Sequence, residues 1–268
     1  MLSKLMKYEF SATGRIFLPI YAALLVMSAL ARLLYSDRMA AVAPRVVATL
    51  VITALFTAVA VITVVMTLSR FWTNLLGREG YLMHVLPVKS WKLVLSKLLT
   101  MAVWTAASIV VCAAALLIML LEAGALREVL GFFPGIIGDA FRYMRENEGL
   151  AQFVVMIVLL VLTAVLSLFS AILRMYTAMS IGQLANRQRV WAAIGAYIGL
   201  GVVFSLISTY ALPGAVGIYG YLGSSATVKD ILSTASTLIW IAFAISAVKT
   251  GALFAATSLL LERRLNLQ

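Results

Sequence analysis

Residues 46–68 read VVATLVITALFTAVAVITVVMTL, a run without a single charged side chain. An α-helix rises about 1.5 Å per residue, so about 20 residues cross the roughly 30 Å hydrocarbon core of a bilayer. The run is long enough to cross. It also lacks the strict alternation of apolar and polar residues found in the strands of membrane barrels. This stretch therefore predicts a transmembrane helix.

Five further runs have the same character, and the composition of the whole chain agrees with them. Hydrophobic residue types make up 63% of the 268 residues, charged types 12%, and the mean hydropathy is +1.06. Soluble domains have about 45–50% apolar and about 25% charged residues. We predict an all-α polytopic membrane protein, with one transmembrane domain over 1–268 and six transmembrane helices. The predicted spans are 16–35, 46–68, 98–121, 153–173, 191–212 and, within the run Ile231–Leu261, 235–261.

The charged residues are distributed unequally over the two sides that six spans define. The side with both termini and the second and fourth loops has 13 basic and 3 acidic residues, and the other side has 7 of each. Lys249 lies within the sixth run. Because cytoplasmic loops are enriched in Lys and Arg, we predict that both termini are cytoplasmic. This topology explains the net charge of +11 without a nucleic-acid partner, and a basic rim suits anionic lipid headgroups.

Two segments outside the spans have their own patterns. Residues 1–14 place apolar side chains on one helical face, which predicts an interfacial helix before the first span; a frayed basic tail is the alternative. The extracellular loop 122–150 is the longest polar segment. Its charges of opposite sign, three or four residues apart, favour a short solvated helix.

The sequence contains no motif for chemistry of its own. It has no G-x-x-x-x-G-K-[ST] motif for ATP, no HExxH and no CxxC. One cysteine, Cys112, and one histidine, His84, exclude an intramolecular disulfide and a metal site rich in His and Cys. No pair of carboxylates lies inside a span. We therefore predict that the chain is not an enzyme and binds neither a metal nor a cofactor itself.

Lys249 lies within an apolar run, and Arg174 lies at the end of another. Lys249 lies in the sixth run, where a charge at the centre of a helix costs about 2.5–3.5 kcal/mol on insertion scales. Either it faces a hydrated interior and a translocation path, or its side chain extends toward the cytoplasm. Arg174 follows the fourth run directly, and we expect it to anchor that helix at the interface.

The first cytoplasmic loop, the 69–97 segment, is unusually aromatic. It reads SRFWTNLLGREGYLMHVLPVKSWKLVLSK, with Gly77 and Gly80 around a charged pair and with Pro87 before the next helix. We read it as helix, turn, short amphipathic helix, proline break and helix. An apolar and charged element near water is a candidate docking surface for another protein. The alternative is an amphipathic helix that lies on lipid.

Three motifs in order give the chain a family resemblance. LMKYEFSATGRIFLPIY (5–21), RFWTNLLGREGYLMHVLPV (70–88) and SIGQLANRQR (180–189) together resemble the permease subunits of bacterial ABC-2 type transporters, of the Firmicute kind. Within that family, the chain is similar to permeases that export amphipathic cytolytic peptides, such as the phenol-soluble-modulin exporters. It is also similar to antimicrobial-peptide immunity permeases.

The resemblance implies partners and contact sites. Such permeases have six spans and an N-terminal elbow helix, pair with a second copy or a paralogue, and work with cytoplasmic ABC ATPase subunits that bind the ATP and magnesium. Their coupling helix maps near Gly77–Pro87, and SIGQLANRQR maps to a second cytoplasmic contact. The implied coupling-helix contacts are Gly77, Arg78, Glu79, Gly80, Tyr81, Leu82, Met83, His84 and Pro87, and the implied second contacts are Gln183, Asn186 and Arg187.

The expected function follows from this resemblance. The chain is expected to be the permease subunit of an ATP-driven exporter in the bacterial cell membrane. It would move amphipathic peptide, drug or lipid-like cargo, with Lys249 as a candidate residue of the path. The alternatives are a membrane-bound peptide sensor or immunity protein that does not pump, and a secondary transporter. The lack of acidic residues inside the spans argues against proton or sodium coupling.

Overall fold

The protein is built from long helices. The structure, a computed structural model, describes residues 2–35, 42–73, 90–120, 131, 150–185, 188–211 and 228–263. Six helices in these ranges are long and apolar enough to cross a membrane, and the described residues contain no strand. The chain is therefore a multi-pass α-helical membrane protein. The helices are α1 (Leu2–Tyr35), α2 (Val42–Phe71), α4 (Ser90–Leu120), α6 (Leu150–Gly182), α7 (Arg189–Ala211) and α9 (Val228–Arg263).

Each helix contains one predicted span, but most helices are longer than the apolar run. The largest differences are in α1, which begins at Leu2, and in α6, which continues past Arg174 to Gly182. Residues 2–35 form one continuous helix with Pro19 inside it, so no helix end follows residue 14. The interfacial position of its first turns stays a prediction. Most of the loop 122–150, predicted to be extracellular, lies outside the described residues.

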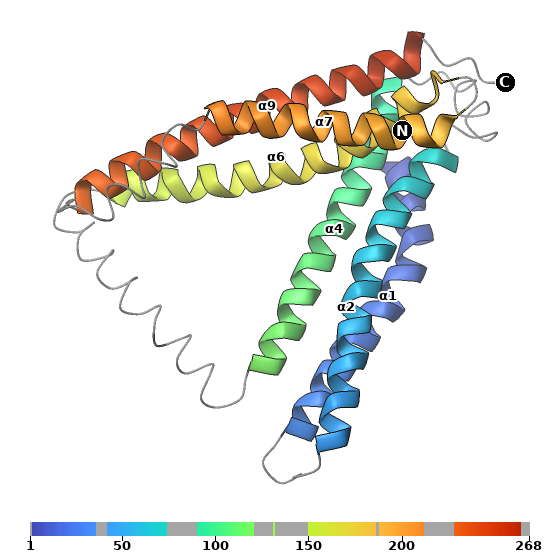
Figure 1. Ribbon diagram of the computed structural model, residues 1–268, viewed down its shortest axis with the longest axis vertical. Coiled ribbons are helices and arrows are strands. Elements are labelled where there is room, and N and C mark those ends of the chain that lie inside the picture. The colour runs from blue at the N-terminus through green and yellow to red at the C-terminus, as the bar shows by residue number, and fades with distance from the viewer. Residues whose placement is uncertain are drawn as a thin grey trace. The chain divides into compact units, whose positions relative to one another are not determined.

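The chain divides into two compact units. The first consists of residues 1–70 and 95–143, and the second consists of residues 71–94 and 144–268. In the first unit α1, α2 and α4 run beside one another (Figure 1). Ala31 of α1 packs against Ala48 and Ile52 of α2. Aromatic rings join α1 to α4, where Phe17 stacks on Trp104 with ring centroids 4.9 Å apart.

A cluster of three hydroxyl groups joins all three helices of the first unit. The Ser108 Oγ of α4 lies 2.6 Å from the Tyr21 hydroxyl of α1 and 3.0 Å from the Thr63 Oγ1 of α2. All three residues are buried. Hydroxyls in a lipid-embedded core need partners within the protein, since lipid tails offer none. Ser108 therefore sets the rotation of the three helices relative to one another within this unit.

We expect Ser108→Ala to lower the free energy of unfolding in detergent by about 1–2 kcal/mol. It removes two interhelical hydrogen bonds, and such bonds in membrane proteins average about 0.6 and reach about 1.7 kcal/mol each. Ser170→Ala is the matched control, because the Ser170 hydroxyl bonds the Ser167 carbonyl of its own helix. Equal stability of the two variants would show that the cluster does not hold the unit together.

The second unit is organised around α6, which packs along both α9 and α7 (Figure 1). The buried hydroxyls of Thr177 on α6 and Thr257 on α9 lie 2.8 Å apart. Farther along the same pair of helices, the Thr250 hydroxyl donates to the Leu166 carbonyl at 3.1 Å. These contacts fix the register of α6 against α9.

The surface of the helices suits a lipid solvent. Large apolar side chains are exposed on both units, including Leu50 (64%), Val110 (66%) and Val158 (51%). Two exposed threonines of α2 have hydroxyls that are hydrogen-bonded within the helix. The Thr53 and Thr57 hydroxyls donate to carbonyls four residues earlier at 2.8 and 2.9 Å. Such a surface would aggregate in water, whereas in a bilayer it is the covered face.

Candidate functional site

Buried residues lie near both ends of the 69–97 segment. Phe71, the last residue of α2, stacks on Tyr176 of α6 with ring centroids 4.1 Å apart and an interplanar angle of 11°. Both rings are fully buried, as are Leu93 and Val94 at the start of α4. These residues belong to the second unit. The predicted coupling-helix contacts from Gly77 to Pro87 lie outside the described residues.

The predicted second cytoplasmic contact falls on the turn between α6 and α7. Three backbone hydrogen bonds of 3.0–3.2 Å close this turn, and one of them is donated by the Gln183 amide. A Cβ built on Gly182 would lie 2.6 Å from the Ala193 Cβ and 2.7 Å from the Arg189 carbonyl oxygen. The two helices therefore approach so closely here that only glycine fits. Gln183 is half-buried, and Asn186 and Arg187 lie outside the described residues.

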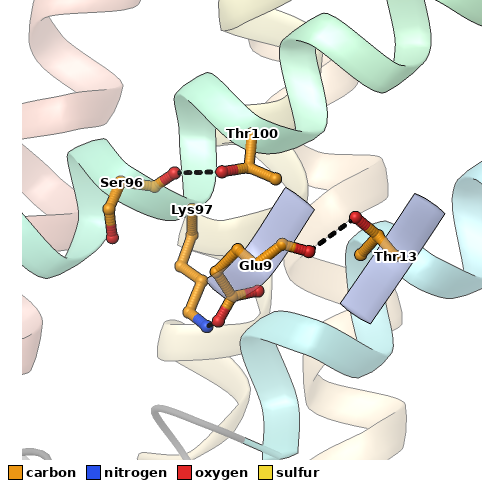
Figure 2. A network of polar contacts seen from close by, with 5 residues as sticks. All are labelled: Glu9, Thr13, Ser96, Lys97 and Thr100. Atoms are coloured by element: carbon orange, nitrogen blue, oxygen red, sulfur yellow. Dashed lines mark hydrogen bonds and ion pairs between the residues drawn. The ribbon is translucent and has the colours of Figure 1, made fainter. Parts of the chain in front are cut away.

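An ion pair joins α1 to α4 within the first unit. The Lys97 ammonium points at the Glu9 carboxylate, and the Thr13 hydroxyl donates to the Glu9 carbonyl at 2.7 Å (Figure 2). The two charged side chains are 4% and 13% exposed for Lys97 and Glu9. The predicted topology places both residues on the cytoplasmic side, but no pattern in the sequence predicts that they form an ion pair. The residues are 88 positions apart, and only the packing of α1 against α4 brings them together.

Arg174 lies inside α6, eight residues before this helix ends at Gly182. Its Nη2 donates to the Tyr197 hydroxyl of α7 at 2.8 Å, and its guanidinium carbon lies 4.6 Å from the centroid of the Tyr197 ring. The helix therefore continues past the charge that ends the apolar run at Leu173. The position of Arg174 at the membrane interface stays a prediction.

Lys249 of α9 also contacts side chains of α7. Its ammonium donates to the Ser208 hydroxyl and lies 5.8 Å from the centroid of the Phe204 ring. These contacts join Lys249 to the last third of α7, which ends at Ala211. No pattern in the sequence pointed to Tyr197 or Ser208, because single hydroxyls in an apolar helix are common.

The described residues hold no cluster of three or more His, Cys, Asp or Glu side chains that could bind a metal. Comparisons with protein-family models, with curated proteins and with solved structures found no match for this chain. The resemblance to ABC-2 type permeases therefore stays a prediction, carried by the three sequence motifs.

Proposed function

We propose that this chain is the permease subunit of an ATP-driven exporter of the ABC-2 type. In this proposal it lies in the bacterial cell membrane with both termini in the cytoplasm. It works with a second permease chain and with separate ATPase subunits that bind ATP and magnesium. Its cargo is amphipathic. The sequence contains no nucleotide-binding motif, so the energy for transport comes from the partner.

The observation that carries the proposal is the burial of Phe71 and Val94, which lie near the two ends of the 69–97 segment. A contact surface transmits force only when its ends are held. Phe71, stacked on Tyr176, holds the first end, and the buried Val94 holds the second. A loop that merely lay on lipid would not need a fully buried aromatic stack at its base. The aromatic and charged residues between these ends then form the surface that the ATPase contacts.

The helices offer a path from this segment into the spans. α2 and α4 each run without a break from the segment into the first unit. Within that unit the Glu9–Lys97 pair and the Ser108 cluster tie α1 to α4. A displacement of the segment by the ATPase therefore moves α1, α2 and α4 together. The alternating opening of a cargo path follows from that movement.

The proposal is tested by co-expressing the chain with the products of its neighbouring genes and purifying it in detergent. We expect an ATPase subunit to remain bound. We also expect Glu79→Ala combined with Tyr81→Ala to lower ATP-dependent export at least about tenfold, because the loss of one interface hot spot already costs about 2 kcal/mol or more. ATP hydrolysis would continue without export, and membrane insertion would be unchanged.

The matched control removes the same residue types from the predicted extracellular loop, as Tyr143→Ala with Glu146→Ala. This variant should export like the parent chain. If no ATPase co-purifies under any of these conditions, the exporter proposal fails and a sensor or immunity protein becomes the better explanation.

A further inference from the structure

Two positive charges inside the second unit have no carboxylate beside them among the residues that the structure describes. The sequences of α6 and α7 contain no Asp or Glu, and the two acidic residues of α9, Asp230 and Glu262, are at its ends. Arg174 and Lys249 lie within the helical stretches Phe153–Gly182 and Thr234–Glu262, which are apolar and long enough to cross a membrane. Ionisable side chains within transmembrane segments are rare and mark substrate or ion pathways. Their partners among the described residues are neutral.

The partners lie on one face of α7. Tyr197, Gly201, Phe204 and Ser208 follow one another at spacings of four, three and four residues, the repeat of a single helical face. Arg174 contacts the first two, and Lys249 contacts the last two. The two cations thus lie along the same face of one helix at successive levels.

This arrangement leaves hydrogen-bonding capacity unused. The Arg174 Nε is buried and has no hydrogen-bond partner in the part of the chain that the structure describes. A guanidinium offers its donors as a fork that matches phosphate and carboxylate. The Lys249 ammonium has three donors. Gly201 leaves the room of a methyl group beside the guanidinium, since a Cβ built there would be in ordinary van der Waals contact with the Arg174 Nη1, at 3.6 Å.

We propose that Arg174 and Lys249 form an anion-binding site, bordered by Gly201, that takes the phosphate group of an amphiphile. An anion at this site would neutralise the two positive charges and accept a hydrogen bond from the unused donor of the guanidinium. Neutral hydroxyl and aromatic partners hold the cations in place but leave their charges uncompensated. The anion therefore supplies the negative charge that the described residues do not provide at this position.

An amphiphile fits the surroundings better than a free ion. Apolar side chains adjacent in sequence to this face of α7 are exposed, including Ile198, Val202 and Val203. They offer acyl chains a surface directly beside the charged groups. The site deepens the proposed function, on which its role in transport rests: the cargo class becomes a lipid-like molecule with a phosphate headgroup. Binding itself does not depend on an ATPase.

The test measures binding to the purified full chain in a nonionic detergent, without ATPase. Fluorescent phosphatidylglycerol is titrated and its anisotropy recorded, with phosphatidylcholine as the zwitterionic comparison. We expect saturable binding of phosphatidylglycerol and at least about tenfold weaker binding in Arg174→Met and in Lys249→Met, because each removes charge-assisted hydrogen bonds. Both variants should insert and fold, since each removes a charge from a span.

A second pair of variants leaves the charges untouched. Gly201→Leu fills the space beside the guanidinium and should also weaken binding about tenfold. Gly199→Leu is its matched control, because a Cβ at Gly199 meets no atom within 4 Å, and it should bind like the parent chain. Competition by inorganic phosphate would show that the site accepts the free anion, and its absence would show that the lipid tails are required.

The proposal is overturned if the parent chain and the Arg174→Met, Lys249→Met double variant bind phosphatidylglycerol equally. It is also overturned if phosphatidylcholine binds as tightly as phosphatidylglycerol, or if only peptides with a free carboxylate bind. Each of these results leaves the ATPase co-purification test unaffected, so the two proposals fail separately.

Discussion

Glu9→Gln is expected to destabilise the protein by about 3–5 kcal/mol. The substitution keeps the size of the side chain but removes the carboxylate that neutralises Lys97, whose side chain is only 4% exposed. Breaking a buried pair by removing one partner typically costs this much, because the remaining charge stays in a medium of low dielectric constant. The free energy of unfolding in detergent or bicelles measures the effect.

A double variant separates the charge effect from lost packing. Glu9→Leu with Lys97→Met should recover most of the lost stability, because buried ion pairs are often replaceable by apolar residues at little cost. Lys92→Met is the control on the same helix. Lys92 is exposed, with its ammonium 5.5 Å from the centroid of the Trp91 ring, and its loss should cost less than about 1 kcal/mol. If Glu9→Gln were as mild as Lys92→Met, the pair would not be buried in the membrane-embedded protein.

Gly182→Ala should disrupt the join between α6 and α7. The added methyl would lie 2.6 Å from the Ala193 Cβ and 2.7 Å from a backbone oxygen, so neither neighbour can move without shifting α7. Overpacking of this kind costs about 1–3 kcal/mol, and a larger side chain such as valine should cost more. Thermal unfolding in detergent and the monodisperse fraction on size exclusion measure the loss.

Gly195→Ala provides the contrast for this prediction. A Cβ at Gly195 meets nothing within 4 Å, and alanine is favoured over glycine in a helix interior by about 0.5–1 kcal/mol. The control should therefore be neutral or stabilising. Equal tolerance at both positions would mean that the close approach of the α6–α7 turn is not maintained in the membrane.

The sequence predicted the number and type of helices because length and hydropathy decide them locally. The run at 46–68 lies wholly within α2, and each of the other spans matches one helix over most of its length. Helix ends were predicted less well. The run in α6 ended at Leu173 because Arg174 carries a charge, and hydropathy alone does not show that Tyr197 of another helix accepts a hydrogen bond from it.

The polar pairings depend on how helices are rotated against one another. Glu9 with Lys97, and Lys249 with Ser208, join residues that are 88 and 41 positions apart. Any of several hydroxyls in the sequence could have served as the partner of Lys249. Packing of α9 and α7 on α6 selects Ser208, and no local pattern encodes that choice. For the contacts implied by the resemblance, only Gln183 falls on described residues.

The threonines of α2 have a consequence for how the chain meets lipid. Each hydroxyl proton at the exposed Thr53 and Thr57 is already shared with a carbonyl one turn earlier. Hydropathy scales count threonine as polar, so they understate how readily this helix partitions out of water. Sliding or rotating α2 in the bilayer consequently exposes no new hydrogen-bonding need at these two positions.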